Sequence, residues 1–381
     1  MRQVSEEERA RLWLNYAVEY NARVFRKIAS GYPSLSELYA AYLEHHLDVS
    51  AWSERVRTRL SEAAKPGFLD AFLELLESKH IDFTYPGKRN YPTLLNEIKD
   101  PPSVLYYIGR IEPDSELAIS IVGSRHPTKY GLEMAKRFGA ELAGAGALIV
   151  SGMAEGVDAA AARGALDNSN RECATVAVLG CGVDVVYPHS NEKLYDEIVA
   201  RGAVVSEFLP GTRPDRFHFP IRNRVMSALA HGTLVIEAAE RSGTSITVSC
   251  AHDQGREVFA IPGRIGDVMS VGPNAMIAHG EAKPVFSAED ILGEFACLHV
   301  AAEPRPEVKR VAFSSLSQPQ QAICRLLEQG EMSFDELCET LGLPIGTLNS
   351  CLTELQFLGI MKQLPGRWYV LDTCQTVLST E

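Results

Sequence analysis

Residues 117–152 read LAISIVGSRHPTKYGLEMAKRFGAELAGAGALIVSG, and they decide the fold. The stretch contains an apolar strand, a turn of glycine and serine, a helix and a second apolar strand. The same order of strand, turn and helix recurs along the chain as far as Gly263. Near-continuous apolar strands that alternate with helices are typical of a parallel sheet covered on both faces. The sequence therefore predicts an α/β fold with a Rossmann-like, doubly wound, mostly parallel sheet.

The turns that follow the strands are short and rich in glycine and serine. They are VGSR (122–125), SGMAEG (151–156), LGCG (179–182), RNR (222–224, later in its loop) and RSGTS (241–245). Right-handed crossovers bring such turns to the carboxyl edge of a parallel sheet. Backbone N–H groups at helix N-termini attract anions there. Because no turn carries paired carboxylates, a metal cluster or an activated nucleophile, we expect a site that binds phosphates without catalysis, metal or cofactor.

Three arginines are candidate phosphate ligands. Arg125 ends the first turn, where its guanidinium could hold a phosphate through two hydrogen bonds. The alternative for Arg125 is an ion pair with a carboxylate such as Glu237. Arg222 and Arg224 follow the aromatic segment FHFP (217–220). Arginines beside aromatic rings suit a groove that tracks a nucleic-acid backbone and stacks unpaired bases, although a salt-bridge cluster at a helix start would use the same residues.

The predicted phosphate pocket combines these side chains with donors from the turns. We expect Phe219 to stack on a base, and Asp158 to cap the helix that follows the second turn. The expected backbone donors are the amides of Gly123, Gly152, Gly182 and Gly243. The predicted nucleic-acid site comprises Gly123, Ser124, Arg125, Ser151, Gly152, Gly182, Arg213, Phe219, Arg222, Asn223, Arg224, Ser242, Gly243 and Thr244.

The net charge of −12 at first argues against a nucleic-acid partner. The charge is not uniform, however, because residues 213–224 contain four arginines and one acid, Asp215. A local basic patch on an acidic protein indicates a binding site rather than a general affinity for polyanions.

The composition also limits the compartment in which the protein works. The eight cysteines never form a C-x-x-C pair, and Cys324, Cys338 and Cys351 stand among apolar helix positions, which favours buried reduced thiols over zinc ligands. The chain contains no apolar run of membrane-spanning length, and its first residues are too acidic for a secretory signal. We therefore expect a cytoplasmic protein without a membrane segment.

Changes in composition along the chain predict three domains. Residues 1–80 have the apolar periodicity of short helices and predict a small helical domain. Residues 81–300 contain the sheet. A polar, proline-containing linker at 301–315 leads to a pattern of three helices and a hairpin, which predicts a winged helix at 316–375.

The helix that would read DNA in this winged helix lacks suitable side chains. Residues 347–358 contain no lysine or arginine, and their one charged residue is Glu354. Groove readers need guanidinium or amide groups for base edges and cations for phosphates. We therefore favour a protein-contact or structural role for the domain.

Nine motifs follow one another in an order that resembles the DNA-processing protein A family, also called DprA or Smf. They are YPTLLNEIKDPPSVLYYIG (from Tyr91), IVGSR, SGMAEGVD, AVLGCGVDVVYP, SEF, FPIRNR, VIEAAERSGTSIT, GREVFAIPG and GPNAMIAHG. The resemblance covers residues 90–290. It implies a Rossmann-like core that binds single-stranded DNA without sequence preference, forms a homodimer and delivers the strand to the recombinase RecA in natural transformation.

The resemblance further implies that the chain is not an enzyme and that its N-terminal helical domain is SAM-like. By motif, Arg125 carries over as the phosphate-gripping arginine, and Arg222 and Arg224 carry over as the RNR pair. Residues carried over from the other motifs are the helix-start donors at 242–244 and, within a more variable loop, Arg213 and Phe219.

Two other functions would use a similar core. A nucleotide phosphoribohydrolase of the lysine-decarboxylase-like group would need a P-G-G-x-G-T turn followed by a catalytic glutamate. This chain instead has RSGT at 241–244, with Glu237 and Glu240 upstream. A winged-helix transcription regulator with a ligand-sensing core would bind duplex DNA with sequence specificity. Dinucleotide binding and nucleoside triphosphatase activity are disfavoured, because G-x-G-x-x-G does not follow the first strand and G-x-x-x-x-G-K-[ST] is absent.

Overall fold

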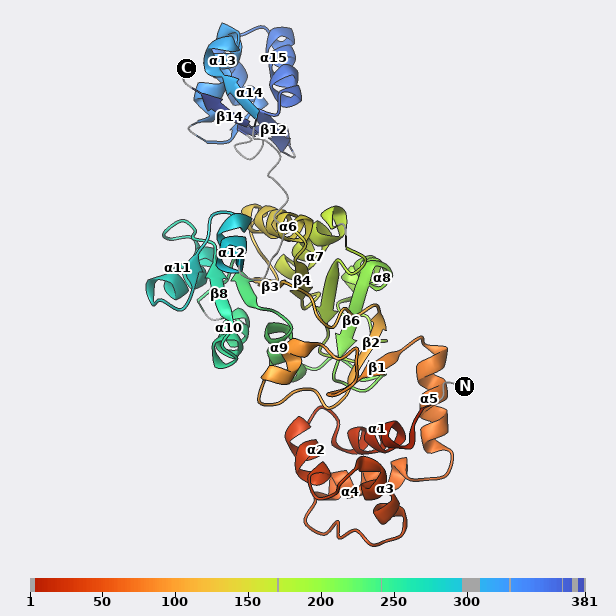
Figure 1. The fold of residues 1–381 in the computed structure, drawn as a ribbon. Helices are drawn as coiled ribbons and strands as arrows, with labels where there is room; N and C mark the ends of the chain where they lie inside the picture. The colour runs from red at the N-terminus through yellow and green to blue at the C-terminus, as the bar shows by residue number, and fades with distance from the viewer. Residues whose placement is uncertain are drawn as a thin grey trace. The chain divides into compact units, whose positions relative to one another are not determined.

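A computed structural model describes residues 4–169, 171–240, 242–296, 309–328, 330–364, 366–371 and 376–379 of the chain. The chain forms two compact units, Met1–Ala302 and Glu303–Glu381. Figure 1 shows the fold of each unit.

The first unit is built on a nine-stranded sheet with the strand order β1-β2-β6-β5-β4-β3-β7-β8-β9. The strands are β1 (Asp82–Thr84), β2 (Leu105–Gly109), β3 (Ala118–Val122), β4 (Leu148–Ser151), β5 (Thr175–Val178), β6 (Gly202–Ser206), β7 (Gly232–Val235), β8 (Glu257–Ala260) and β9 (Lys283–Pro284). Strands β3 to β9 are parallel, whereas β1 and β2 pair antiparallel at one edge. The winding reverses between β3 and β7. The predicted Rossmann-like, mostly parallel sheet is confirmed.

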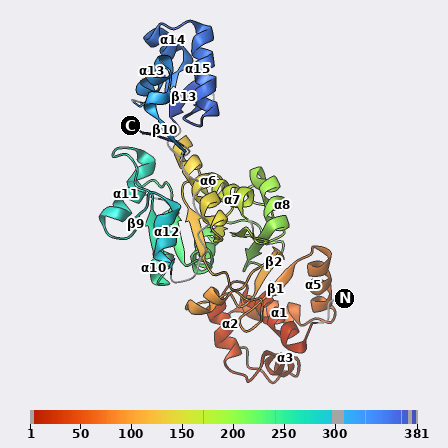
Figure 2. The same cartoon turned by 45° about the horizontal axis from the view of Figure 1, so that its top comes forward.

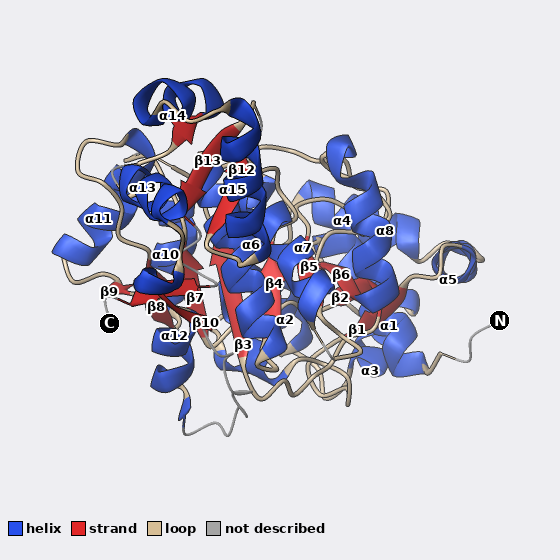
Figure 3. Ribbon diagram, turned by 90° about the horizontal axis from the view of Figure 1, so that it is seen from above, coloured by secondary structure: helices blue, strands red, loops and turns tan. Residues whose placement is uncertain are grey.

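Helices cover both faces of this sheet, as Figure 3 shows. They are α6 (Lys129–Gly144), α7 (Val157–Asn168), α8 (Glu192–Arg201), α9 (His218–Ala228), α10 (Thr244–Asp253), α11 (Val271–Ala278) and α12 (Ala288–Glu294), with the 3-10 helices η2 (His189–Asn191) and η3 (Val268–Ser270). On one face, Ile119 of β3 and Phe138 of α6 share an apolar core. On the other face, Val122 of β3 and Met226 of α9 share a second core. Alternate residues of the same strand therefore face different helix layers.

Helices α6 and α7 lie side by side in Figures 1 and 2, and their backbones are in contact. A Cβ atom on Gly139 of α6 would lie 2.3 Å from the carbonyl oxygen of Ala161. A Cβ atom on Gly164 of α7 would lie 2.1 Å from the carbonyl oxygen of Lys136. A glycine inside a helix costs about 1 kcal/mol relative to alanine, and the close approach of the two helices offsets that cost.

The N-terminal helices share a core with the edge of the sheet. They are α1 (Glu6–Val18), α2 (Ala22–Ala29), α3 (Leu35–Leu43), α4 (Glu54–Ala63) and α5 (Phe68–Ser78), and the 3-10 helix η1 (Thr93–Glu97) follows β1. Trp13 of α1 is fully buried, and its Nε1 donates to the carbonyl oxygen of Leu60 at 3.1 Å. The hydroxyl of Tyr106, in β2, donates to Oδ1 of Asn15 at 2.7 Å. Whether residues 1–80 form a domain of their own stays a prediction.

In its described residues the second unit contains three α-helices, a small antiparallel sheet and a parallel pair of strands. Its elements are β10 (Lys309–Ala312), η5 (Phe313–Ser315), α13 (Gln318–Leu327), β11 (Met332–Ser333), α14 (Phe334–Leu341), α15 (Ile345–Phe357), β12 (Met361–Leu364), β13 (Trp368–Leu371) and β14 (Thr376–Ser379). Strands β11, β13 and β12 form the antiparallel sheet, and β10 pairs with β14 in parallel. This is the predicted arrangement of a winged helix. Throughout the described residues, every helix is too short or too polar to cross a bilayer.

The cysteines that the structure describes are free thiols. Cys173, Cys181, Cys324 and Cys351 are buried and Cys250 and Cys338 are half-buried, whereas Cys297 and Cys374 lie outside the described residues. Burial raises the pKa of Cys173 and of Cys181 to about 12, so both thiols are protonated at neutral pH. The prediction of buried thiols at positions 324, 338 and 351 is confirmed for Cys324 and Cys351, whereas Cys338 is half-buried.

The contact between α6 and α7 predicts that Gly164→Ala destabilises the protein. The added methyl group would collide with the backbone at Lys136, so we expect the free energy of unfolding to fall by about 1–3 kcal/mol in urea titrations. The control is Gly293→Ala in α12, where a Cβ atom meets nothing within 4 Å. That variant should be neutral or more stable by about 0.5–1 kcal/mol. Equal stabilities of the two variants would contradict the proposed packing.

Candidate nucleic-acid interface

A groove of about 610 Å³ lies where β3 and β7 end, at the point where the winding of the sheet reverses. In open α/β sheets this is the usual place for a ligand. A cavity of about 40 Å³ adjoins the groove and shares Arg125, Tyr187, Phe219 and Arg222 with it.

The structure brings most of the predicted site residues together. Those that line the groove are Gly123, Ser124, Arg125, Phe219, Arg222, Asn223, Ser242, Gly243 and Thr244. Gly152 lines the smaller cavity. Among the described residues of the predicted site, those that line neither cavity are Ser151, Gly182, Arg213 and Arg224.

Arg125 is exposed, and its guanidinium lies over the ring of Phe219, 5.1 Å from the ring centre. The alternative partner, Glu237, is buried and accepts hydrogen bonds from the backbone N and Oγ1 of Thr128 at 2.8 and 2.6 Å. A Cβ atom on Gly131 would lie 2.3 Å from Oε2 of Glu237, so a glycine is needed there for this carboxylate to reach Thr128. Glu237 is therefore occupied, and the head group of Arg125 faces the groove.

The turn that carries Arg125 is held on both sides. The backbone N of Ser124 donates to the carbonyl oxygen of Glu237 at 2.7 Å, and the N of Val157 donates to the carbonyl oxygen of Ser124 at 3.2 Å. Gly156 has a φ of 78°, and a Cβ atom on it would lie 2.5 Å from the Ser124 oxygen. The end of β3 is thus fixed to the ends of β7 and of the turn before α7.

Arg222 is buried, which corrects the prediction that it is a free phosphate clamp. Its Nη1 donates to the carbonyl oxygen of Gly152 at 2.8 Å and to that of Val178. A Cβ atom on Gly152 would lie 2.1 Å from the same nitrogen, so the turn needs glycine there. Burial raises the pKa of Asp158 and lowers that of Arg222, and the attraction between the two charges opposes both shifts. Arg222 therefore forms part of the floor of the groove.

Arg224 lines neither cavity, which corrects the prediction that it joins Arg125 and Arg222 in holding successive phosphates. Its guanidinium donates to the buried carboxylate of Glu207 and, at 2.5 Å, to the carbonyl oxygen of Asp100. Residues two positions apart on a helix face different directions. Within α9, Arg222 therefore contacts Gly152 and Val178, whereas Arg224 contacts Glu207 and Asp100.

Two of the backbone amides predicted to bind phosphate are already hydrogen-bonded. The N of Gly182 donates to the carbonyl oxygen of Thr212 at 2.9 Å. The N of Gly152 donates to Oδ2 of Asp158 at 2.9 Å, and the N of Ala154 donates to the same atom at 3.5 Å. Asp158 thus holds the turn that precedes α7, which corrects its predicted role as a cap of that helix.

The predicted site omits several residues that line the groove, among them Tyr187 and Arg216. Tyr187 stacks on Phe219 with 5.6 Å between ring centres and 28° between ring planes. Arg216 lines the groove, whereas Arg213, which was predicted, lies outside it. The sequence could have indicated Tyr187 and Arg216, because Tyr187 stands in the conspicuous segment DVVYP and Arg216 belongs to the basic patch at 213–224.

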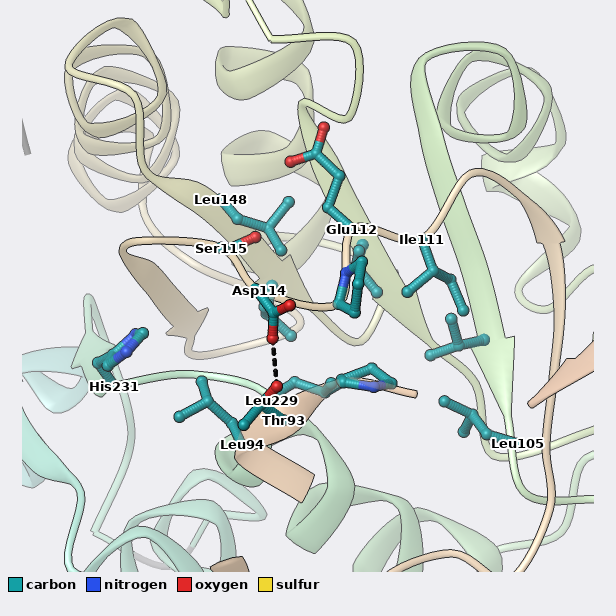
Figure 4. Close-up of a pocket in the computed structure, with 15 residues that line it drawn as sticks. Thr93, Leu94, Leu105, Ile111, Glu112, Asp114, Ser115, Leu148, Leu229 and His231 are labelled. Carbon is teal, nitrogen blue, oxygen red and sulfur yellow. Dashed lines mark hydrogen bonds between the residues drawn. The ribbon is translucent and has the colours of Figure 1, made fainter. Parts of the chain in front are cut away.

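A different cavity, of about 220 Å³, lies against the sheet near the start of β4 (Figure 4). Its floor is apolar and includes Leu105, Leu148 and Leu229. A hydrogen bond from Thr93 to Asp114 crosses it. No lysine or arginine belongs to the described residues that line it, so it lacks the charge that a phosphate site requires.

Comparison with known proteins identifies close relatives of both units. The family described as DNA recombination-mediator protein A matches residues 82–296, and the DprA winged helix domain matches residues 307–367. The chain is 31% identical to the protein Smf of Synechocystis sp. over 330 residues, which cover 78% of the chain and 82% of the relative. It is 43% identical to the DNA processing protein DprA of Streptococcus pneumoniae over 205 residues, or 54% of the chain and 71% of the relative.

Two solved structures resemble the chain over long stretches. The X-ray structure of DprA from Streptococcus pneumoniae superimposes with a TM-score of 0.64 at 32% identity, covering 77% of this chain and 99% of that one. DNA processing protein A from Helicobacter pylori, whose structure was solved for its single-stranded DNA binding mode, gives a TM-score of 0.52 at 30% identity. It covers 57% of this chain and 98% of its own.

The buried pair of Glu207 and Arg224 predicts a pH-dependent stability. Burial raises the pKa of Glu207 from 4.5 to about 7 despite the opposing charge of Arg224, and its Oε1 has no hydrogen-bond partner among the described residues. Between pH 4.5 and pH 7, the carboxyl group of Glu207 is therefore protonated in the folded chain and ionised in the unfolded chain. The contribution of Glu207 to the free energy of unfolding should therefore be greatest below pH 4.5 and should fall by roughly 3 kcal/mol as the pH rises to 7.

Urea unfolding of the wild type and of Glu207→Gln at pH 5 and pH 8 tests this expectation. The glutamine cannot titrate, so the variant should lose less stability than the wild type between the two pH values. The same loss in both proteins would show that Glu207 does not change its protonation in this range.

Proposed function

Because the chain belongs to the DNA recombination-mediator protein A family, we propose that it binds single-stranded DNA in the groove at Arg125 and delivers the strand to the recombinase RecA. The observation that carries the proposal is the exposed guanidinium of Arg125, which rests on the Phe219 ring in a groove at the carboxyl edge of the sheet. A guanidinium in this position can hold a phosphate through two hydrogen bonds.

The exposed charge at the groove is positive although the whole chain is acidic. Arg125 and Arg216 are exposed residues of its lining. Asp215 is also exposed in the lining, and its Oδ1 accepts from the backbone N of Phe217 at 2.8 Å, whereas Asp158 is buried and accepts from two turn amides. The exposed charges of the lining are therefore two arginines against one aspartate. A phosphate backbone would therefore meet cations first, and contacts with phosphates carry no sequence information.

The aromatic lining favours single strands over duplexes. Phe219 and Tyr187 line the groove beside the cations and stack on each other. Ring faces of bases are accessible in an unpaired strand and are covered by stacking in a duplex, so aromatic rings beside cations are typical of single-strand binders. This combination supports binding without sequence preference.

The winged helix supports a role in protein contacts rather than duplex reading. The exposed side chains along α15 include Ile345, Asn349, Thr353 and Phe357, all of them uncharged. A duplex reader would need cations on this helix. A transcription regulator that reads duplex DNA is therefore the weaker proposal.

The chain is proposed to act as a homodimer. Ile265 is fully exposed and Val268 is 66% exposed on the segment between β8 and α11. Apolar side chains gathered on one exposed loop favour a covering partner. Two grooves on one strand would raise the avidity without new contacts, and a strand held on two copies could be passed to RecA in natural transformation or another recombination process.

The alternative of a nucleotide phosphoribohydrolase has less support. Its catalytic glutamate would have to follow the glycine turn, whereas Glu237 and Glu240 precede it, and Glu237 is buried and bonded to Thr128. Incubation with nucleoside monophosphates tests the alternative, because release of free base would support the enzyme and contradict our proposal.

Binding of fluorescent oligothymidine across a salt series tests the groove. The wild type should bind single strands far more tightly than duplexes of the same length. Removing one phosphate ligand should weaken binding about tenfold at low salt and flatten the plot of log affinity against log salt by about 0.7–1. We expect this of Arg125→Ala and not of Arg163→Ala, a control at an exposed position on α7.

Arg224→Ala separates the groove from the buried cluster. Because Arg224 pairs with Glu207, its loss should lower the melting temperature and leave the salt slope unchanged. An unchanged slope in Arg125→Ala, or a flattened slope in Arg224→Ala, would contradict the proposed groove. For delivery, the chain should increase RecA-driven strand exchange on the same oligonucleotides, and no increase would remove RecA from the proposal.

A further inference from the structure

The ring of Phe219 is already in contact with other groups of the protein. The Arg125 guanidinium lies over it at 5.1 Å, and Tyr187 stacks on it at 5.6 Å. A Cβ atom on Gly180 would lie only 2.9 Å from its Cδ1, so the backbone also approaches the ring closely. A base could stack on Phe219 only beside or in place of these neighbours.

Phe217, two residues earlier, is in the opposite situation. The residue is 65% exposed although it is large and apolar. Within the part of the chain that the structure describes, its ring is contacted by Arg216, whose guanidinium lies 4.7 Å from the ring centre. Arg216 itself lines the groove. The ring therefore lies just beyond a cation that the groove already contains.

The backbone that carries Phe217 is held in place. Its N donates to Oδ1 of Asp215 at 2.8 Å, and the N of His218 donates to the carbonyl oxygen of Asp215 at 3.0 Å. The imidazole of His218 stacks on Phe208 at 4.3 Å and lies 3.2 Å from the carbonyl oxygen of Gly180. An exposed ring on a fixed backbone can bind a partner with little loss of conformational entropy.

We propose that Phe217 and Arg216 form a second nucleotide site, in which an unpaired base stacks on the Phe217 ring and its phosphate contacts Arg216. This inference rests on the proposed function and extends it, because it assigns a path that leaves the groove past Arg216. Base stacking on aromatic side chains does not depend on sequence. The same site therefore adds affinity without adding sequence preference.

The stacking energy of a base on an aromatic ring predicts the size of the effect. Alanine substitution of such a ring typically weakens binding by about tenfold or more. Phe217→Ala should therefore bind oligothymidine about tenfold more weakly than the wild type. Phe217→Tyr should restore most of the affinity, because it retains the ring. Phe286→Ala is the matched control, since Phe286 is 74% exposed and lies outside the loop.

Abasic scanning locates the site along the strand. A single abasic nucleotide is moved step by step through the oligothymidine, and the affinity is measured for the wild type and for Phe217→Ala. At one position the abasic nucleotide should weaken the wild type about tenfold and leave Phe217→Ala unaffected, because the variant has already lost that stacking contact. At every other position the two losses should add.

Three outcomes overturn the inference. Wild-type affinity in Phe217→Ala, or additive losses at every abasic position, would show that no base stacks on Phe217 even when the wild type binds and Arg125→Ala weakens binding. Failure of the wild type to bind any oligothymidine would overturn the proposed function and this inference together. An unchanged melting temperature of Phe217→Ala excludes misfolding as the cause of a loss.

Discussion

The buried guanidinium of Arg222 is the interaction on which the groove depends. It donates hydrogen bonds to the carbonyl oxygens of Gly152 and Val178, which lie at the ends of the neighbouring strands β4 and β5. Arg222 itself belongs to a third element, α9. Asp158 supplies the opposing charge from α7 and at the same time accepts two amides of the turn before that helix. A buried charge without a partner costs several kcal/mol, so arrangements of these elements that separate Arg222 from its partners are disfavoured by about that amount.

This arrangement separates arginines that build the site from arginines that are available to a ligand. Arg222 and Arg224 are both held by carbonyl or carboxylate oxygens of the protein. Arg125 and Arg216 lie over aromatic rings and remain exposed in the groove. A guanidinium on a ring keeps its N–H groups free for phosphate, because the ring contacts only its face. The cation–π contact thus orients the arginine without using up its donors.

The N-terminal helices are also connected to α9, the helix that carries Arg222 and Arg224. Asp100 forms ion pairs with Arg23 and Arg26 of α2 at 2.8 and 2.5 Å, and its carbonyl oxygen accepts from Arg224. Tyr20, just after α1, contacts the rings of Phe208 and His218 at 4.9 and 5.8 Å. These contacts hold α9 through residues that do not line the groove, which gives the helical segment a structural reason to share one compact unit with the sheet.

The alternation of apolar strands with helices was sufficient to predict the parallel sheet and the edge at which its turns gather, because both follow from local periodicity and from the handedness of the crossovers. The local motif was also enough for Arg125, since a residue in the first turn of such a sheet must lie at that edge. The directions in which the side chains of Arg222 and Arg224 point could not be predicted from the RNR motif. They depend on which of two helix faces meets the Gly152 turn and which meets Glu207, and those neighbours lie 70 and 17 residues away in the chain. The amide of Gly182 was misjudged for the same reason, because its acceptor, Thr212, lies 30 residues away in the chain. The acceptor of the Gly152 amide, Asp158, is only six residues away, and this local contact was overlooked because Asp158 was assigned to the cap of its helix.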